Sequence, residues 1–379
     1  MNSIAPAQAR ISVIGAGPGG LTCARILQRR GLAVTVHDRE TGPEVRNQGG
    51  SLDLHADNGQ IALREAGLLD EFFELARPEG QEMRILDQDG TLTAHEVPEA
   101  GERFKPEIDR GVLRDLLLES VEPGTVRWGQ GLVSVSGPAD GPRLLHFADG
   151  TTVETDLVIG ADGASSTVRS AISPAVPGYT GVSFLEAWFD DVDNSHPQIA
   201  ELVGQGMAHA GDGERALLAQ RNGGNHIRVY AIQQVPADWI GQAGLAADDT
   251  DGIRSLLLGR FAHWSPLMRR LIADNDGPYV QRPIFALPVP HAWEPNPTVT
   301  LLGDAAHLMP PLGVGVNLAM LDAGELALAL AGEATVADAV RVYESTMLPR
   351  STETAKLLDG AAADLLSAEL PDFGADAQP

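Results

Sequence analysis

The sequence predicts an α/β protein in which a Rossmann-like nucleotide-binding domain is interrupted by a mostly-β domain and followed by a C-terminal helix. Three features support this fold class. A strand, a glycine-rich turn, a helix and a second strand follow one another within residues 10–39. From about 176 to 290 the chain changes to strand patterns with Gly-, Asn- and Asp-rich connections. Residues 298–307 then resume a buried strand pattern, which returns the chain to the first domain.

The first unit is a strand–helix–strand pattern. Residues 10–14 (RISVI) form a short apolar strand. Residues 21–30 (LTCARILQRR) have apolar side chains at helical spacing and a basic last turn, and this helix ends at Gly31. Residues 32–39 (LAVTVHDR) form a second strand rich in β-branched residues. Such a unit predicts two neighbouring parallel strands joined by a right-handed crossover.

A G-x-G-x-x-G motif lies between the first strand and the helix. Gly15 allows the tight turn, Gly17 lets the backbone approach a pyrophosphate, and Gly20 lets the helix pack against the strand. The start of the helix offers unpaired N–H groups and the positive end of its dipole to phosphates. Asp38, at the end of the second strand, is placed to bind ribose hydroxyls. These features predict a dinucleotide site, although they do not distinguish NAD from FAD.

The middle of the chain contains elements of both kinds. Residues 59–76 predict an amphipathic helix, and residues 83–97 predict a hairpin with its turn at Asp89-Gly90. Residues 110–121 predict another helix. Further strand patterns lie at 125–128, 144–154 and 156–163.

Ala-rich helical segments run from about 317 to 367 and complete the chain before a polar tail. We expect three units along the sequence. They are a discontinuous nucleotide-binding domain at 1–75, 98–175 and 285–340, a substrate-binding domain at 76–97 and 176–284, and a C-terminal helix at 341–370.

Composition narrows the classes of partner. The 379 residues are 43% hydrophobic and 21% charged, as in soluble globular proteins. A formal net charge of −25 argues against nucleic acid and against anionic lipid surfaces. The single Cys23 excludes an intrachain disulfide, and the ten histidines show no metal-ligand spacing. Neither a signal peptide nor a membrane-spanning run is visible. We therefore expect a monomeric cytoplasmic protein without a metal, a membrane or a nucleic acid as partner.

Two further motifs narrow the cofactor by resemblance. Residues 156–169 read DLVIGADGASSTVR, and residues 303–317 read GDAAHLMPPLGVGVN. In this order and separation, they and the first motif resemble the three fingerprints of the FAD-dependent aromatic monooxygenases of group A, the para-hydroxybenzoate hydroxylase type. The resemblance spans roughly 10 to 350. Within that family, RNQGGSLDLHADNGQ and PEIDRGVLRDLL resemble the tetracycline-inactivating monooxygenases (TetX type).

The resemblance implies an α/β enzyme that uses FAD, NADPH and dioxygen to hydroxylate a bulky phenol or enol. It implies that Arg46 lies near the nicotinamide dinucleotide, that Asp53 and Arg110 contact FAD, and that Asp304 binds the ribityl chain. No side-chain nucleophile is needed, because the flavin carries the chemistry, so we name no catalytic residue. The expected cofactor-binding residues are Gly15, Gly17, Gly20, Asp38, Arg39, Arg46, Asp53, Arg110, Asp162, Asp304, Gly313, Gly315 and Asn317.

Several of these residues also have a purely structural interpretation. Asp304 could cap the helix that follows its strand. Asp162-Gly163 with Arg169 could be an ordinary turn beside a surface arginine. His307 is expected to be a structural part of the GDAAH turn rather than a general base.

The substrate side differs from the tetracycline-inactivating pattern. By resemblance, Glu186 and Arg228 are the expected substrate-binding residues, but that pattern has Gln and His at their positions, and Gly206 replaces a substrate-contacting Arg. The loop beside the flavin is one residue shorter, and Val314 replaces the usual glutamine. A tetracycline or another polycyclic phenol is the leading expectation, and Trp188 could line the pocket for such a flat molecule.

Three other functions would have different signatures. A flavin-dependent halogenase needs a W-x-W-x-I-P stretch, which the sequence lacks. A reductase of the same fold would not consume oxygen in a coupled reaction. A non-catalytic protein that sequesters an antibiotic would bind substrate without oxidising NADPH.

Overall fold

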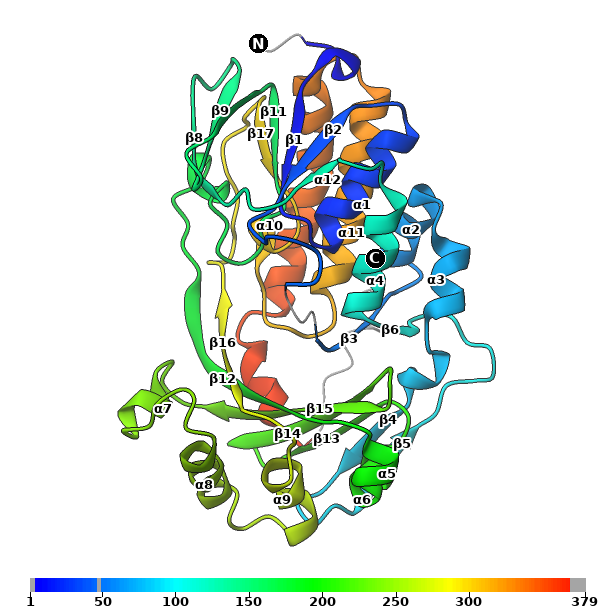
Figure 1. Cartoon of the computed structure of the whole chain (residues 1–379), viewed down its shortest axis with the longest axis vertical. Helices are drawn as coiled ribbons and strands as arrows, with labels where there is room; N and C mark the ends of the chain where they lie inside the picture. Colours follow the sequence, from blue (N-terminus) through cyan, green and yellow to red (C-terminus); the bar gives the residue numbers. More distant parts are fainter. Residues whose placement is uncertain (1–3, 46–48, 369–379) are drawn as a thin grey trace.

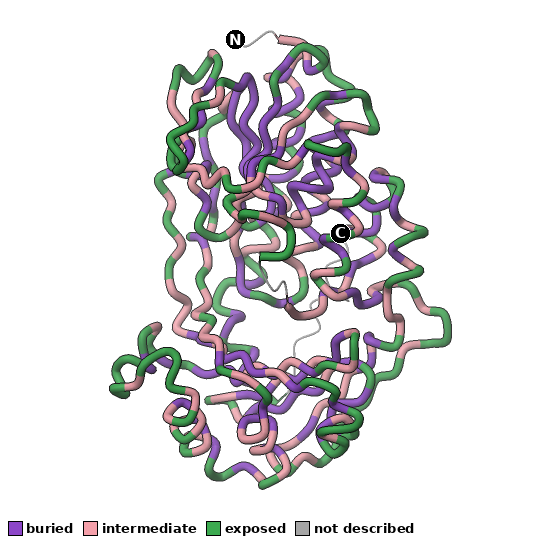
Figure 2. The backbone as a smooth tube through the Cα atoms, viewed as in Figure 1, coloured by how far each residue is buried: buried purple, intermediate pink, exposed green. Residues whose placement is uncertain are grey.

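The computed structural model describes residues 4–45 and 49–368. Figure 1 shows two parts, one built of helices around a small parallel sheet and the other of a broad sheet backed by short helices. The chain crosses between the parts several times, so segments far apart in sequence form each of them. In Figure 2 the buried backbone is concentrated inside each part, and the exposed backbone lies at the periphery.

A five-stranded parallel sheet forms the centre of the first part. Its order is β17 (Val299–Leu301), β11 (Leu157–Gly160), β1 (Ile11–Ile14), β2 (Val34–His37) and β7 (Val126–Arg127). Ile11 pairs with Val34 on one side and with Leu157 on the other, both in parallel register. The predicted strand–helix–strand unit is therefore confirmed. All three motifs lie at strands of this sheet, since β1, β11 and β17 are neighbours in it and one motif follows β1, one contains β11 and one follows β17.

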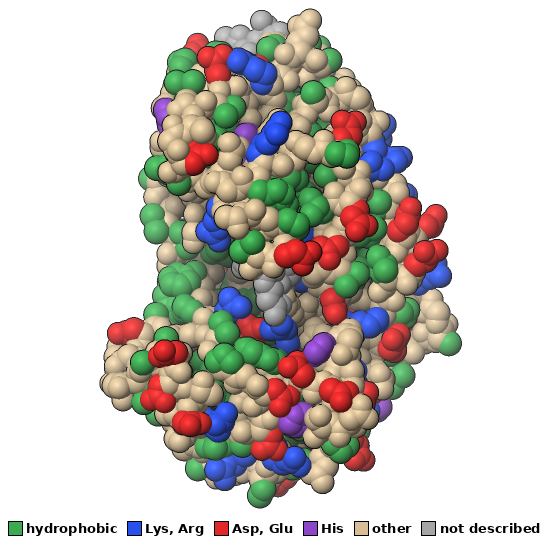
Figure 3. Space-filling view, in the orientation of Figure 1, with side chains coloured by type: hydrophobic (Ala, Val, Ile, Leu, Met, Phe, Trp, Pro, Cys, Tyr) green, Lys and Arg blue, Asp and Glu red, His purple; other side chains and the backbone are tan. Residues whose placement is uncertain are grey.

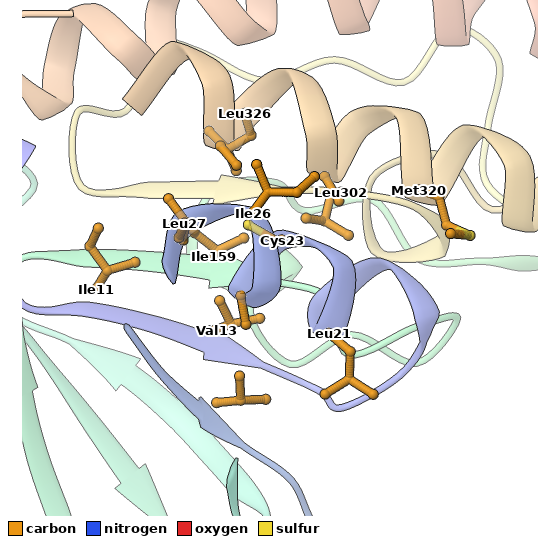
Figure 4. Close-up of a cluster of buried hydrophobic side chains, with 14 of the residues drawn as sticks. Ile11, Val13, Leu21, Cys23, Ile26, Leu27, Ile159, Leu302, Met320 and Leu326 are labelled. Atoms are coloured by element: carbon orange, nitrogen blue, oxygen red, sulfur yellow. The ribbon is translucent and has the colours of Figure 1, made fainter. Parts of the chain in front are cut away.

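Helices bury the faces of this sheet. α1 (Pro18–Arg29) packs on α11 (Gly315–Gly332), and α12 (Val336–Leu357) packs on α11 in turn. α1 begins earlier than its apolar pattern indicated, because a proline is tolerated where the first helical N–H has no partner. Figure 4 shows Cys23 enclosed by apolar side chains from these elements. Burial raises the pKa of the Cys23 thiol to about 12, so the thiol stays protonated and unreactive.

The predicted helix over 59–76 is wrong in one respect, since the structure has two helices there. α2 (Gly59–Ala66) ends at Gly67, whose φ of 68° is left-handed, and α3 (Leu69–Leu75) follows. Both helices continue the same amphipathic pattern, so the apolar periodicity of the sequence gives no sign of the break between them. A glycine at this position ends the helix because it adopts the left-handed conformation without strain.

Two small sheets flank the first part. The strands β8 (Leu132–Ser136), β9 (Arg143–Phe147) and β10 (Thr152–Thr155) form an antiparallel sheet. A two-stranded ribbon joins β3 (Ser51–Asp53) to β6 (Glu107–Asp109), and α4 (Arg110–Ser120) starts directly after it. Short 3₁₀ helices lie at η1 (Pro6–Gln8), η2 (Pro78–Gln81) and η3 (Arg169–Ala171).

The second part is a seven-stranded, mainly antiparallel sheet with helices on its outer face. Its order is β16 (Val280–Ala286), β12 (Gly178–Phe189), β15 (His226–Gln234), β14 (Arg215–Asn222), β13 (Met207–Gly211), β4 (Met83–Leu86) and β5 (Leu92–Glu96). The helices are α5 (Val192–Ser195), α6 (Pro197–Val203), α7 (Trp239–Gln242), α8 (Thr250–Arg260) and α9 (Pro266–Ala273). The sequence interpretation predicted the strands but not these helices. Trp239 and Trp264 belong to the core between sheet and helices.

The C-terminal region differs from the helix expected over 341–370. α12 starts at Val336 and ends at Leu357, and the short η4 (Ala361–Leu366) then packs against the second sheet. Gly360, at φ 83°, turns the chain between them. The strand expected over 298–307 is also shorter, because β17 ends at Leu301 and α10 (Asp304–His307) follows. The last segment therefore bridges the two parts.

In the part of the chain that the structure describes, one helix is long and apolar enough to cross a membrane by length and composition. This helix is α11, and half of its apolar window is buried inside the protein. It packs against α1, α2 and α12 and carries the buried Asp322. Core helices of globular proteins have the same properties.

Candidate functional site

A large cavity of about 2000 Å³ lies between the two parts. Ligand pockets for one small molecule are typically about 300–1,000 Å³, so this one has room for a dinucleotide and a second molecule. Its walls include all three sequence motifs, the β3–β6 ribbon and the inner face of the second sheet. In Figure 3 the surface is hollowed between the two parts, and Lys and Arg side chains are visible in the hollow.

The glycine motif is shaped as the sequence analysis predicted. A Cβ on Gly15 would lie 2.3 Å from the carbonyl oxygen of Ala161, and one on Gly20 would lie 2.0 Å from that of Gly15. Gly17 has open space on its Cβ side and lines the cavity. Gly15 and Gly20 thus allow the close packing of strand and helix, while Gly17 leaves the start of α1 accessible to a ligand. Gly20 does not line the cavity.

Asp38 lines the cavity and is already held in place by the backbone. Its Oδ2 accepts a hydrogen bond from the Ala16 N–H at 2.7 Å, and its Oδ1 accepts one from the Glu40 N–H at 2.8 Å. Each carboxylate oxygen has a second lone pair, so the group can still accept hydroxyl hydrogens. Arg39, the next residue, is exposed at the cavity wall.

Arg114 is a cavity residue that the sequence analysis missed. Its guanidinium, which is buried, donates to the carbonyl oxygens of Ala16 and Pro43 and to Oε2 of Glu40. It therefore ties α4 to the glycine motif. Arg110 lies one helical turn before it and lines the same cavity. This i, i+4 arginine spacing on a helix after the ribbon is the signal that could have identified Arg114.

The middle motif is a braced turn. Asp162 accepts hydrogen bonds from the Ser166 hydroxyl, the Thr167 N–H and the Val168 N–H, and burial raises its pKa. The turn exposes Gly163 to the cavity. Arg169 is 2% exposed, so the interpretation as a surface arginine is wrong.

The buried Arg169 connects the middle motif to the third. Its guanidinium donates to the carbonyl oxygens of Ala164, Asp304 and Ala305. Burial lowers its pKa, while the charges of Asp162 and Asp304 oppose that shift. The two motifs are thus joined by a buried cation rather than only by proximity.

Asp304 does not cap the helix that follows its strand. Gly303 occupies the N-cap position of α10 without a side-chain cap, and Asp304 is the first residue of the helix. Its carboxylate is exposed at the cavity wall and accepts no hydrogen bond from any residue in 4–45 and 49–368. The side chain is therefore available to a ligand. Gly313 and Gly315 line the cavity nearby, at the start of α11.

Asn317 has a different position from the one expected. It is 1% exposed and does not line the cavity. Its Oδ1 accepts from the N–H groups of His55 and Gly59, and its Nδ2 donates to the carbonyl oxygens of Asp53 and Gly313. Asn317 braces the loops around the cavity, because every hydrogen-bonding group of its amide already has a protein partner.

A buried charge network holds the GDAAH turn. Asp322 of α11 accepts from the Gly303 N–H, from His307 and from Arg350 of α12, at 3.0, 2.7 and 2.8 Å. Burial lowers the pKa of His307, but the charge of Asp322 outweighs that effect and the net shift is upward. These contacts support the structural role expected for His307.

The β3–β6 ribbon places two acids side by side at the cavity wall. Asp53 and Glu107 are directly opposite each other in the antiparallel register, so their side chains share one face. Asp53 lies 2.9 Å from Nε2 of His55, and Glu107 accepts from Gln220 at 3.1 Å. Burial raises the pKa of Glu107 to about 8, and the charge of Asp53 adds to this rise. Glu107 is thus mainly protonated at neutral pH, a property that the sequence pattern did not indicate.

The inner face of the second sheet forms the floor of the cavity. Along β12, Phe184, Glu186 and Trp188 face the cavity, while the intervening residues belong to the core on the other face. Tyr230 of β15 packs against Phe184 with ring centroids 5.9 Å apart. The floor therefore combines aromatic surface with the charge of Glu186, and Trp188 lines the cavity as anticipated.

Both expected substrate-binding residues lie on this floor. Arg228 forms an ion pair with Glu186, and Arg282 of β16 donates to the other Glu186 oxygen at 2.9 Å. Gly206 does not line the cavity. It packs against the backbone of Glu82, whose carbonyl oxygen would lie 2.1 Å from a Cβ at this position. Arg46 lies outside the described residues.

Comparison with known proteins agrees with this geometry. The sequence profile described as "FAD binding domain" matches residues 8–239 and 292–356. The chain is 32% identical to monooxygenase asqM of Emericella nidulans, and the match covers 84% of this chain and 83% of that protein. The chain belongs to the FAD binding domain family.

Solved structures of the same fold cover nearly the whole chain. Klebsiella pneumoniae HpxO, complexed with FAD and uric acid, superposes with a TM-score of 0.79 at 23% identity, covering 96% of this chain and 90% of that one. Tetracycline destructase Tet(51) superposes with a TM-score of 0.69 at 20% identity, covering 96% and 94%. At these identities the structural likeness shows the fold and not the substrate. The comparisons therefore support membership of the wider monooxygenase family, and they do not single out the tetracycline-inactivating enzymes within it.

As a member of this family, the protein is an FAD-dependent monooxygenase of the aromatic hydroxylase type. Its cavity fits the flavin dinucleotide. The open Gly17 at the start of α1 suits a pyrophosphate, and the unpaired Asp304 carboxylate suits a polyol chain. The start of α11 at Gly315 presents positive dipole charge toward the same wall.

Proposed function

We propose that this monooxygenase hydroxylates a flat, bulky phenol or enol, with NADPH as the reductant and dioxygen as the oxidant. The observation that carries the proposal is that one cavity joins the three motifs to an aromatic floor on the second sheet. A molecule lying on that floor would face the glycine loop at the start of α11. Bound FAD supplies the redox and oxygen-transfer chemistry, and the protein supplies position and electrostatics.

The proposed cofactor contacts follow from the walls of the cavity. Gly15, Gly17 and the start of α1 hold the pyrophosphate, and Asp38 with Arg39 lies at the ribose end. Asp162 keeps the middle motif in the shape that admits the cofactor, through its three hydrogen bonds.

The other wall is proposed to hold the ribityl chain and the ring. Asp304 accepts hydrogen bonds from ribityl hydroxyls, and Asp53 and Arg110 approach from the ribbon and α4. Gly313 and Gly315 bring the backbone close to the ring, where the dipole of α11 stabilises negative charge. Arg46 is assigned to NADPH by the motif resemblance alone.

The floor of the second sheet is proposed to position the substrate. Phe184, Trp188 and Tyr230 offer aromatic surface to a flat ring system, while Glu186 and Arg228 provide polar contacts. Enclosure of the substrate between floor and ribbon excludes water from the reacting carbon.

Two substrate groups are candidates. The motif resemblance favours tetracycline-type antibiotics, in which case the reaction inactivates the drug and confers resistance. The replacements at Glu186, Gly206 and Arg228 favour another aromatic polyketide or a smaller phenol. A catalytically inactive, antibiotic-sequestering flavoprotein is the remote alternative.

The test is the rate of NADPH consumption in air by the purified yellow protein, with tetracyclines, polycyclic phenols and simple phenols compared side by side. We expect at least one phenol or enol to accelerate NADPH oxidation and to gain an oxygen atom. NADH in place of NADPH checks the choice of reductant. Ligand binding without any acceleration would refute catalysis and favour sequestration.

A further inference from the structure

Three charged side chains on the floor of the cavity form a cluster with a surplus of positive charge, in a strongly acidic chain whose floor also carries the acidic Glu96 and Asp190. Glu186 contributes one negative charge, while Arg228 and Arg282 each contribute one positive charge. The cluster is therefore net cationic, although the whole chain has a formal net charge of −25. Because solution electrostatics of the chain would repel anions, a cationic cluster inside its ligand cavity is a feature that needs an explanation.

The three side chains are fixed by the geometry of the sheet. Glu186 lies on β12, directly opposite Tyr230 of β15 and Val280 of β16. Its two carboxylate oxygens are each taken by a different arginine, Arg228 from one neighbouring strand and Arg282 from the other. The side chain of Glu186 is 7% exposed, and its carboxylate fixes the positions of the two guanidinium groups on the floor.

The two arginines differ in how many N–H donors they leave exposed to the cavity. The side chain of Arg228 is 16% exposed, and the backbone of Gly49 packs directly against its guanidinium. The side chain of Arg282 is 52% exposed and uses only Nε for Glu186. Within residues 4–45 and 49–368, neither terminal nitrogen of Arg282 has a hydrogen-bond partner. Arg282 therefore presents a planar pair of N–H donors at the cavity wall.

Tyr230 lies within the electrostatic reach of these positive charges. Burial raises the pKa of its phenol and the charge of Glu186 adds to the rise, while Arg228, Arg110 and Arg282 all oppose it. The charges of three arginines, from β15, α4 and β16, thus act on the same phenol at the cavity wall. Tyr230 keeps its proton at neutral pH and can donate a further hydrogen bond.

We propose that Arg282, held by Glu186, is the specificity-determining residue of this monooxygenase and binds a planar anionic group with two oxygens on the substrate. A carboxylate beside a phenol and the enolate of a β-dicarbonyl have this chemistry, and both accept two parallel N–H donors of one guanidinium. The inference rests on the proposed function and narrows its substrate class. It selects acidic phenols and enols and disfavours neutral phenols of the same size.

The experiment uses the flavin-loaded protein and measures ligand dissociation constants from the change in flavin absorption, without turnover. The probes are an ortho-hydroxynaphthoate and its methyl ester, which differ only in the anionic group. The parent protein should bind the acid at least about tenfold more tightly than the ester, because a charge-assisted bidentate pair contributes about ten- to hundredfold in affinity. Arg282→Gln should remove this preference and leave ester binding unchanged. Arg282→Lys should retain part of it, since the charge is kept without the fork.

Arg270→Gln is the matched control. Arg270 also donates through Nε to one carboxylate, that of Asp274 at 2.6 Å, but it lies on α9 outside the cavity. Its replacement should change neither affinity. Equal affinity of the parent for acid and ester, no binding of either, or equal loss of both in Arg282→Gln would overturn the proposal. Each of these results leaves a yellow, NADPH-oxidising protein, whereas failure of the proposed function itself would appear as absent flavin or absent oxygenation.

Discussion

Replacing Asp322 by alanine should destabilise the protein and loosen the wall that holds Asp304. Asp322 is fully buried and is the common acceptor for the Gly303 N–H, His307 and Arg350. Its removal leaves the buried Gly303 N–H and the buried His307 without this acceptor, and leaves Arg350 with Glu325 as its remaining ion-pair partner. Since Gly303 directly precedes Asp304, the orientation of that carboxylate depends on the same contacts.

The size of the effect follows from what is left unpaired. Breaking a buried ion pair by removing one partner typically costs about 3–5 kcal/mol. Total stabilities of domains are about 5–15 kcal/mol, so a large share would be lost. Glu325→Ala is the matched control, because Glu325 pairs with the same Arg350 but is partly exposed, and its loss should cost at most about 1 kcal/mol.

The pH dependence has a definite sign. The folded-state pKa of His307 is raised, so its stabilisation is complete below the ordinary imidazole pKa and is lost as pH rises through the raised value. Burial raises the pKa of Asp322, but hydrogen bonds and the charges of His307 and Arg350 outweigh burial, and the net shift of the pKa is downward. The stabilisation that ionised Asp322 contributes is therefore lost as pH falls through its lowered folded-state pKa. The difference in the free energy of unfolding between the parent and Asp322→Ala should therefore be largest at an intermediate pH and become smaller at both higher and lower pH.

Urea unfolding followed by tryptophan fluorescence measures these differences, and retained FAD absorbance measures the effect on the site. If Asp322→Ala lowers the free energy of unfolding by less than about 1 kcal/mol, or by no more than Glu325→Ala does, the proposed role of Asp322 is refuted.

Three further outcomes test the site. Gly17→Ala should leave the stability of the flavin-free protein unchanged, because a Cβ there meets no protein atom, and should weaken FAD binding, because that space is the proposed pyrophosphate site. Gly20→Ala should instead lower the free energy of unfolding by about 1–3 kcal/mol, because its Cβ would overlap the Gly15 carbonyl. Thermal melts of the two flavin-free variants separate them, and equal melting temperatures would contradict the assignment. Asp304→Ala should weaken FAD binding by about ten- to hundredfold with little change in the melting temperature of the flavin-free protein, and unchanged flavin content would exclude its assignment to the cofactor. Glu107→Gln should become more stable relative to the parent as pH rises from about 4.5 to about 8, since only the parent must keep a buried acid protonated, and a pH-independent difference would show that Glu107 is ionised in the folded state.

Local patterns were sufficient for the first part of the fold. The apolar strand before Gly15, the glycine spacing and the strand ending at Asp38 each depend on neighbours in sequence, and the structure has the predicted parallel pairing. The break at Gly67 was missed because the apolar periodicity continues through it. The helices behind the second sheet were missed because they are short, and their burial comes from packing on distant strands.

The polar contacts within the site were harder to predict than its location. The spacing of the three motifs predicts where the site lies, but the third motif also predicts Asn317 as a cofactor contact, whereas its amide braces two loops distant in sequence. The sequence leaves a surface position open for Arg169, because burial depends on contacts with residues distant in sequence. Glu107 and Arg282 acquire their properties from partners on other strands, Asp53 and Glu186, and only the strand register brings them together.

Oxygen-isotope labelling of the product tests the central claim most directly. The flavin-loaded protein, NADPH and an accelerating phenol or enol would be incubated under dioxygen enriched in the heavy isotope, and the product mass would be measured. The account predicts that the product gains one labelled oxygen atom per molecule and that this gain requires NADPH. A product whose new oxygen comes from water, or a substrate recovered without any added oxygen while NADPH is consumed, would contradict it.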